Sequence, residues 1–203
     1  MDEGPNPFLT EVERSRLESA RIGIAGAGGL GSNCAMHLVR ASVTHLTIAD
    51  FDVVAESNLN RQFFFRNQIG RKKVYALAEN LWRINVNVKL VLLPIRLTRE
   101  NFAATFADCD ILVEAFDSAD AKAMFLASAT PLDKPMVMAS GIAGWGHSAE
   151  VVPRMIGGRL IAIGDGESGV GGEAGLYPVS PRVGIAAAME ANAVCSIILG
   201  HQF

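Results

Sequence analysis

The segment Gly26-Ala27-Gly28-Gly29-Leu30-Gly31 constrains this chain more than any other, because the apolar run Ile22–Ala25 leads into it and a helical pattern follows. Glycines at 26, 28 and 31 match the G-x-G-x-x-G spacing: the first permits a tight turn, the second lets a phosphate approach the backbone, and the third lets helix pack on strand. Free N–H groups and the dipole at the helix N-terminus favour a bound phosphate. The segment, Gly29 included, predicts a nucleotide site, but alone it does not separate a dinucleotide from ATP or S-adenosylmethionine.

Composition limits the fold and the partners. With 203 residues, half of them apolar and 19% charged, the chain can bury one substantial core, so we expect a single domain over 1–203. A net charge of −3, without a run of five like charges, gives no basis for binding nucleic acid or an anionic membrane. No apolar run approaches the roughly 18 residues of a membrane helix, and the N-terminus lacks a signal-peptide pattern. We therefore expect a cytoplasmic protein.

The cysteines and histidines indicate neither a disulfide framework nor a zinc site. Cys34, Cys109 and Cys195 are far apart, odd in number and without a C-x-x-C pair. All three fall in or beside apolar elements, where cysteine usually acts as a small hydrophobe, so we expect none to be catalytic. Four histidines lack metal or triad spacing and are interpreted as structural or surface residues: His37, His45, His147 and His201.

Strand-like and helical segments alternate along the chain, which indicates a Rossmann-like, doubly wound α/β fold with a mostly parallel sheet covered on both faces. After Ser140 the alternation stops. There we expect an antiparallel hairpin around Ile156-Gly157-Gly158, an irregular glycine-rich loop over 164–175, and a buried helix starting near Pro181; residues 1–20 form an N-terminal extension. The expected strands are Arg21–Gly26, His45–Asp50, Val86–Leu92, Asp110–Glu114, Pro135–Ala139, Ser148–Val152 and Arg159–Ile163, and the expected helices are Gly31–Ala41, Gly70–Ile84, Thr98–Phe106, Asp117–Thr130 and Arg182–Leu199.

Asp50 ends the second expected strand, nineteen residues beyond Gly31. In this architecture an acidic side chain at that place accepts hydrogen bonds from ribose hydroxyls, which favours an adenine nucleotide with a free ribose. Asp52 is the weaker candidate for the same role. The alternative is that Asp50 only caps the turn Asp50-Phe51-Asp52.

Polar and basic residues follow where an ordinary dehydrogenase would continue with a helix. Arg61 offers a planar fork of donors and Lys73 a mobile point charge at a helix start, so together they could neutralise phosphate oxygens. Asn58 adds an amide able to bond a phosphate or the loop backbone. These residues suit a triphosphate better than a nicotinamide, although Arg71-Lys72-Lys73 could be a solvated helix turn and Arg61 a surface ion pair.

Five segments, in order, resemble motifs of the carrier-protein-activating adenylyltransferases, the superfamily of ThiF, MoeB, HesA and the adenylation domains of ubiquitin-activating enzymes. The resemblance spans about residues 20–200. Within the superfamily the chain looks most like the short ThiF branch of thiamine biosynthesis, in length and in lacking zinc cysteines. The five segments are Gly26-Ala27-Gly28-Gly29-Leu30-Gly31-Ser32, Asp50-Phe51-Asp52-Val53-Val54, Ser57-Asn58-Leu59-Asn60-Arg61-Gln62, Ile69-Gly70-Arg71-Lys72-Lys73-Val74 and Glu114-Ala115-Phe116-Asp117-Ser118-Ala119.

The resemblance implies a role for each candidate residue. Asp50 would hold the ribose, while Asn58, Arg61 and Lys73 would surround the triphosphate and Asp117 would hold Mg²⁺. Because Asp117 follows an apolar strand, its carboxylate would emerge at the carboxyl edge of the sheet, and a hard oxygen ligand suits Mg²⁺. The alternative is that Asp117 is an ordinary helix N-cap.

The implied reaction is ATP-dependent adenylation of the C-terminal Gly-Gly carboxylate of a small ubiquitin-like sulfur-carrier protein by a homodimeric enzyme. A carboxylate is already a charged nucleophile, so the site needs positioning and charge stabilisation rather than a general base. Relatives often supply an arginine from an N-terminal segment to the partner subunit, and Arg14 and Arg16 are the possible substitutes here. Two alternatives stay open: an NAD-dependent oxidoreductase, and a non-catalytic carrier-binding subunit of the same fold.

Overall fold

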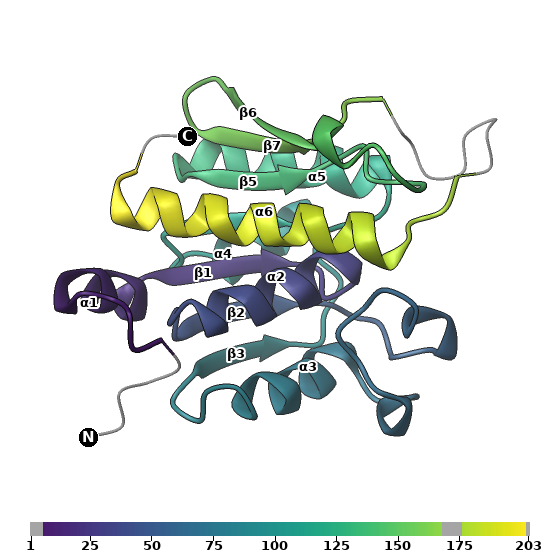
Figure 1. Ribbon diagram of the computed structural model, residues 1–203, viewed down its shortest axis with the longest axis horizontal. Helices are drawn as coiled ribbons and strands as arrows, with labels where there is room; N and C mark the ends of the chain where they lie inside the picture. The colour runs from purple at the N-terminus through teal and green to yellow at the C-terminus, as the bar shows by residue number, and fades with distance from the viewer. Residues whose placement is uncertain (1–5, 168–175, 202–203) are drawn as a thin grey trace.

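A seven-stranded sheet forms the centre of the molecule (Figure 1). The computed structural model describes residues 6–167 and 176–201. The strand order is β3-β2-β1-β4-β5-β7-β6, and every neighbouring pair is parallel except β6 with β7. The strands are β1 (Arg21–Ala25), β2 (His45–Ala49), β3 (Lys89–Leu93), β4 (Ile111–Glu114), β5 (Met136–Ala139), β6 (Val152–Ile156) and β7 (Leu160–Gly164).

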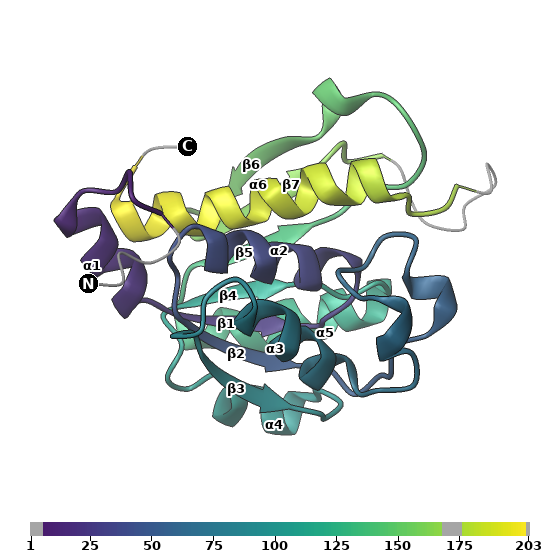
Figure 2. The ribbon, with the colours of Figure 1, turned by 60° about the horizontal axis from the view of Figure 1, so that its bottom comes forward.

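Helices cover both faces of the sheet (Figure 2). One apolar cluster joins α2, α3 and α6 to one face, and a second joins α4 and α5 to the other face. These layers confirm the predicted Rossmann-like fold. The helices are α1 (Glu11–Ser19), α2 (Gly29–Arg40), α3 (Lys73–Trp82), α4 (Arg99–Thr105), α5 (Ala119–Ala129) and α6 (Ser180–Leu199), with short 3₁₀ turns η1 (Glu56–Asn58), η2 (Arg66–Gln68), η3 (Thr130–Leu132) and η4 (Ser148–Glu150).

The C-terminal hairpin exists, but its first strand lies later than expected. Gly157 and Gly158 both have positive φ, which makes a tight turn directly after Ile156. The pairing therefore starts with Ile156 opposite Leu160, and the residues expected to begin the strand form η4 instead. Strand β7 also extends through Gly164, the first residue of the expected glycine-rich loop, of which 168–175 lie outside the described residues.

Helix α6 is the expected buried C-terminal helix, with one face in the core and most of its opposite side partly buried. The helix packs against α2 and runs over β5 and β7, and its small residues Ala186 and Ala187 are completely buried. Ile185 and Met189 are only partly buried. By length and composition α6 is also apolar enough to cross a membrane, contrary to the expectation from sequence, but here it packs as a core helix on its neighbours.

The buried face of α6 carries a carboxyl group whose protonation should make stability depend on pH. Glu190 is fully buried, and among the described residues neither of its oxygens has a hydrogen-bond partner. Burial, reinforced by the nearby Glu114 charge, raises the pKa of Glu190 well above its ordinary value. Between that ordinary value and the raised one, the folded state holds a proton that the unfolded chain releases. Stability therefore falls as pH rises through this window.

We expect Glu190→Gln to remove this pH dependence, because the amide cannot ionise. The free energy of unfolding, measured by urea denaturation from pH 5 to pH 8, should fall less steeply for the variant than for the wild type, which can lose up to about 1.4 kcal/mol per pH unit from one such group. Asp108→Asn, at an exposed position, serves as the control and should keep the wild-type slope. Parallel curves for Glu190→Gln and wild type would contradict the buried neutral carboxyl.

Gly31 permits the close packing of α2 on the sheet. A Cβ built on it would lie 1.9 Å from the carbonyl oxygen of Gly26, a backbone atom that cannot rotate away. We expect Gly31→Ala to destabilise the fold by about 3 kcal/mol, near the upper end for overpacking. In the matched variant Gly184→Ala nothing lies within 4 Å of the new Cβ. Thermal unfolding should therefore show a large decrease in melting temperature for Gly31→Ala and no decrease for Gly184→Ala.

Candidate nucleotide-binding site

The site lies where β1 and β4 end side by side at the carboxyl edge of the sheet. The chain leaves β1 into α2 on one face and leaves β4 toward α5 on the other, so the two connections diverge at the switch point of the sheet, where folds of this kind usually form the crevice that binds a ligand. The glycine segment follows β1, and residues 115–118 follow β4. The two are in contact, because a Cβ on Gly26 would lie 2.8 Å from the carbonyl oxygen of Ala115.

The glycine segment presents the start of α2 to this crevice. Gly28 is the N-cap of α2 and has no side chain to bond the first N–H groups of the helix. Those groups therefore remain suited to an anion. A Cβ on Gly29 would lie 3.6 Å from Cγ of Arg61, so the Arg61 side chain passes directly over the helix start.

Asp50 is placed as expected, and its carboxylate is already hydrogen bonded. Its Oδ2 accepts from the Ala27 N–H at 2.7 Å, and its Oδ1 accepts from the Asp52 N–H at 2.8 Å. The second bond is the turn cap considered as the alternative, while the first ties Asp50 to the glycine segment. A carboxylate has about four acceptor positions, so ribose hydroxyls could still bond here. The ribose role stays a prediction.

Asp52 and Lys73 form an ion pair beside this turn. The Lys73 Nζ lies 3.0 Å from the Asp52 Oδ2, and the lysine side chain is only 7% exposed while Asp52 is half-exposed. Lys73 is the first residue of α3. The neighbouring Arg71 and Lys72 are exposed, with Arg71 paired to Glu79, so the solvated-turn alternative fits those two residues and not Lys73.

Arg61 and Asn58 are held by neutral loop groups. The Arg61 Nη1 donates to the Ser57 carbonyl at 3.2 Å and to the Asn60 Oδ1 at 2.7 Å, and Arg61 makes no ion pair within residues 6–167 and 176–201. Its charge is therefore not neutralised by a carboxylate of that part of the chain. Asn58 accepts the Ala55 N–H through Oδ1 at 3.0 Å, which is the loop-backbone role.

A buried pair of amides, not anticipated from the sequence, fixes this irregular loop to α3. Gln68 donates to the Asn80 Oδ1 at 2.8 Å and to the Ala76 carbonyl at 3.1 Å. Asn80 donates in turn to the Phe63 carbonyl at 2.8 Å. In the sequence, only Asn80 indicated such a pair, because it is a polar residue on the otherwise apolar face of a helix. The pair holds the segment that carries Arg61 against the core.

Asp117 lies in the loop after β4, at the edge where the glycine segment begins α2. It is exposed, and within the described chain its carboxylate takes part in no ion pair. Ser118, not Asp117, caps α5: the Ser118 Oγ accepts the Ala121 N–H at 3.3 Å. The N-cap alternative for Asp117 was therefore wrong, because the chain turns into the helix one residue later.

Burial disfavours the thiolate form of all three cysteines. Cys34 and Cys109 are buried, and burial raises the pKa of both. Burial also raises the pKa of Cys195 to about 11. Because the thiolate is the nucleophile, each of these residues holds little reactive form at neutral pH. This supports the expectation that none is catalytic.

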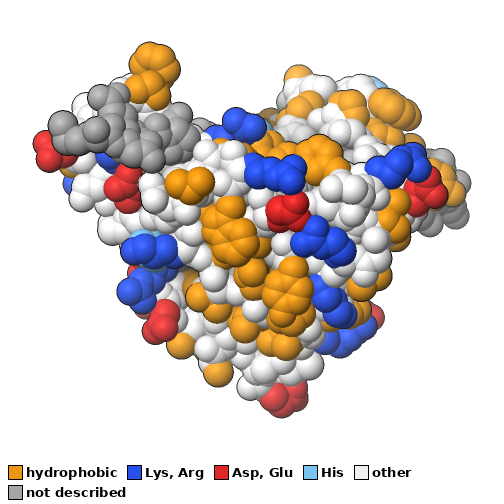
Figure 3. All heavy atoms as spheres, turned by 90° about the horizontal axis from the view of Figure 1, so that it is seen from below, with side chains coloured by type: hydrophobic (Ala, Val, Ile, Leu, Met, Phe, Trp, Pro, Cys, Tyr) orange, Lys and Arg blue, Asp and Glu red, His pale blue; other side chains and the backbone are white. Residues whose placement is uncertain are grey.

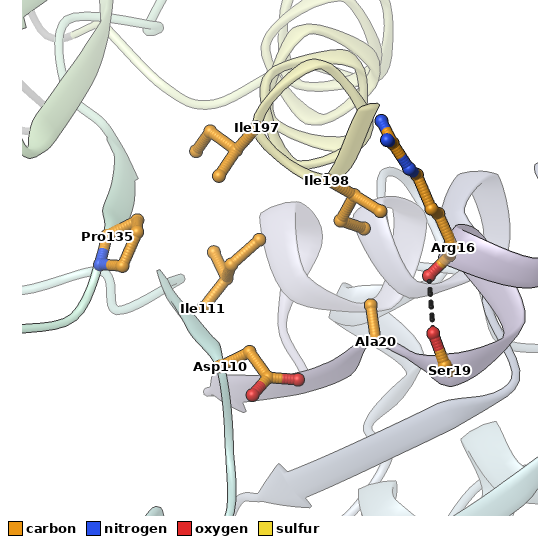
Figure 4. A pocket seen from close by; sticks show the side chains of 8 residues that line it. All are labelled: Arg16, Ser19, Ala20, Asp110, Ile111, Pro135, Ile197 and Ile198. Atoms are coloured by element: carbon orange, nitrogen blue, oxygen red, sulfur yellow. Dashed lines mark hydrogen bonds between the residues drawn. The ribbon is translucent and has the colours of Figure 1, made fainter. Parts of the chain in front are cut away.

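Two hollows lie away from the crevice. One hollow, of about 400 Å³, lies at the amino edge of the sheet (Figure 4). The end of α6 borders it on one side, and Arg16 of α1 and Ala20, the C-cap of α1, border it on the other. A second hollow, of about 600 Å³, opens beside β2, β3 and α4.

Arg14 and Arg16, the two arginines considered for a role in the partner subunit, are both hydrogen bonded within this chain. Arg16 donates to the Leu199 carbonyl at 3.1 Å, and Arg14 donates to the Asn6 carbonyl at 3.1 Å. Within one copy, the two candidate trans arginines therefore lie at the opposite edge from the glycine segment.

Fold and site together define a Rossmann-like α/β domain with a glycine segment at the carboxyl edge of its sheet and cationic residues near that segment. The sequence profile of the ThiF family matches residues 5–202, and the chain belongs to that family. It is 34% identical over 136 residues to an adenylyltransferase and sulfurtransferase UBA4 of Meyerozyma guilliermondii, covering 66% of this chain and 32% of that protein. It is 30% identical over 194 residues to a probable adenylyltransferase/sulfurtransferase MoeZ of Mycobacterium tuberculosis, covering 95% of this chain and 47% of that protein.

Solved structures share the fold at lower sequence identity. E. coli tRNA N6-threonylcarbamoyladenosine dehydratase TcdA, in complex with ATP, has a TM-score of 0.86 at 19% identity, over 97% of this chain and 92% of that chain. E. coli MccB with AMPCPP and MccA has a TM-score of 0.72 at 17% identity, over 94% and 59%. The chain spans about a third to a half of the length of the curated relatives it matches.

Proposed function

We propose that this protein transfers the adenylyl group of ATP to the C-terminal carboxylate of a small carrier protein. One observation carries the proposal: Asp50 is bonded to the glycine segment, Arg61 passes over the start of α2, and Lys73 pairs with Asp52 in the Asp50 turn. Asp117 is exposed at the same sheet edge. Hydride transfer releases no pyrophosphate, whereas adenylyl transfer needs cations that neutralise the charge of this leaving group. ThiF-family membership and the adenylyltransferase relatives support the same chemistry.

In this reaction a carboxylate oxygen attacks the α-phosphorus of ATP, an O–P bond forms, and the bond to the pyrophosphate oxygen breaks. Arg61 and Lys73 would stabilise the charge that accumulates on the phosphate oxygens, and the N–H groups of the α2 start would bind one phosphate. Asp50 would fix the ribose. No proton has to be removed from the nucleophile, which fits a site built from cations and backbone donors.

The donor set also fits a magnesium ion held jointly by protein and phosphate. Mg²⁺ is usually bound through one or two carboxylates plus substrate phosphates. Within residues 6–167 and 176–201 no three His, Cys, Asp or Glu side chains are grouped to hold a metal, so a fully protein-made cage is not formed there. Asp117 would provide the single carboxylate. The ion would supply positive charge to the triphosphate.

We further propose that the carrier is a ubiquitin-like sulfur carrier ending in Gly-Gly, in line with the adenylyltransferase and sulfurtransferase names of the relatives. The thiamine branch stays a prediction from motif resemblance.

We also propose that the protein forms a homodimer. Apolar and basic side chains alternate on the side formed by β3 and α3 (Figure 3), where Tyr75 and Trp82 are each nearly half-exposed and could be covered by a second copy.

The proposal is tested by mass spectrometry of the carrier after incubation with the protein, ATP and Mg²⁺. We expect the mass of an adenylate on a carrier ending in Gly-Gly, and none on the same carrier with both glycines removed. Calorimetric titration distinguishes the remaining classes: the protein should bind ATP in preference to NAD. Binding of NADH without ATP binding would indicate the oxidoreductase, and ATP binding without adenylate would indicate a non-catalytic carrier-binding subunit.

A further inference from the structure

An ion pair between Glu114 and Lys122 is buried directly beneath the Asp117 loop. Glu114, the last residue of β4, is completely buried, and Lys122 of α5 is 18% exposed. The Lys122 Nζ lies 2.8 and 3.0 Å from the two carboxylate oxygens of Glu114. It also donates to the carbonyl of Ala139, the last residue of β5, at 2.8 Å.

The same pair fixes the backbone of the loop itself. The Glu114 Oε1 accepts the Phe116 N–H at 2.6 Å, one residue before Asp117. Ala115, between them, packs on the glycine segment: a Cβ on Gly31 would lie 3.1 Å from the Ala115 Cβ. The pair therefore joins four parts of the molecule, namely the ends of β4 and β5, helix α5 and the loop that borders the glycine segment.

Stability alone does not explain a buried charge pair at this place. Removing two charges from water costs about as much as their attraction returns, and apolar replacements of both partners are often neutral or stabilising. What the pair provides that apolar side chains do not is directed bonding to the Phe116 N–H and the Ala139 carbonyl.

We infer that Lys122 and Glu114 are positioning residues that set the loop 115–118, and with it Asp117, against the phosphate end of the nucleotide. The inference rests on the proposed function, because Lys122 and Glu114 would affect ATP binding only through the position of Asp117. Asp117 is exposed and one residue from the Phe116 anchor, so losing the anchor frees the loop without removing the carboxylate.

The decisive variant is the double substitution Glu114→Leu/Lys122→Met, which removes both charges together, so that neither is left buried without its counter-ion, and with them the bonds to the Phe116 N–H and the Ala139 carbonyl. Lys122→Met alone is made in parallel. The matched control is Lys134→Met, because the Lys134 Nζ likewise fastens backbone carbonyls, those of Phe106 and Ala107, but at the opposite edge of the sheet. Two quantities are measured: amide hydrogen exchange of residues 115–118 without nucleotide, and the ratio of ATP affinities with and without Mg²⁺.

For the double variant we expect exchange of residues 115–118 to rise at least tenfold and the magnesium-dependent gain in ATP affinity to fall at least tenfold, with metal-free ATP affinity within threefold of wild type. Lys134→Met should change neither quantity, whatever its effect on melting temperature. Unchanged exchange and an unchanged Mg²⁺ ratio in the double variant, or equal changes in Lys134→Met, would overturn the inference. If the wild type bound no ATP, the proposed function would fail, while the exchange measurement would still decide whether the pair positions the loop.

Discussion

Arg61→Ala should slow adenylation of the carrier by about 10²–10³, the scale for removing one preorganised charge-stabilising donor. The reason is the position of Arg61 over the start of α2 and its neutral hydrogen-bond partners, which leave its charge available to phosphate. The fold should persist, since the side chain is only partly buried on a loop held by Gln68 and Asn80. Initial rates at saturating ATP and carrier, with melting temperature recorded, measure the effect.

Arg66→Ala is the matched control, because Arg66 lies on the same loop but is mostly exposed and pairs with exposed Glu56. Exposed ion pairs contribute little, so its rate and melting temperature should stay near wild type. Lys73→Ala should match the rate loss of Arg61→Ala. It should also lower the melting temperature, because Lys73 is buried against Asp52. A folded Arg61→Ala variant with a near-normal rate would reassign Arg61 to the protein surface.

Asp117→Ala should abolish adenylation and weaken the magnesium dependence of ATP binding. The carboxylate is exposed at the edge where the connections that follow β1 and β4 diverge, and it does not cap α5. Its removal should therefore affect the metal and not the fold. Calorimetric titration of ATP with and without Mg²⁺, together with the melting temperature, distinguishes the two. Asp120→Ala, an exposed carboxylate in the first turn of α5, is the control and should retain the wild-type ratio of affinities. If Asp117→Ala kept full activity, the metal would have to be held elsewhere.

The parallel core was predictable because its signals are local. The glycine spacing is readable only after a strand and before a helix, and each apolar strand is short and bounded by turn residues. The position of Asp50 follows from the same rule, since a residue at the end of a parallel strand reaches the ligand edge. The placement of Lys73 at a helix start was predicted correctly for the same local reason.

Features that depend on long-range packing were not predictable in this way. The Glu114–Lys122 pair joins a strand end to the next helix and to β5, and the partner of Lys73 is Asp52, 21 residues earlier. Which side of α6 is buried completely and which only partly depends on what packs on it, and periodicity alone does not reveal this in a helix that is apolar all round. The hairpin turn lies at Gly157 and Gly158 as expected, but its first strand was placed too early, because the register set by this turn pairs Ile156 with Leu160 and extends the strand back only to Val152.

The central claim is that this site activates a carrier carboxylate with ATP, and carrier-dependent exchange of labelled pyrophosphate into ATP tests it most directly. Exchange requires reversible formation of the adenylate, so it reports the proposed step without any later chemistry. With Mg²⁺ and a small ubiquitin-like protein ending in Gly-Gly, we predict rapid exchange, none when the two glycines are removed, and exchange slower by about 10²–10³ when Arg61 is replaced by alanine. No exchange with the Gly-Gly carrier, or equal exchange without any carrier, would contradict the account.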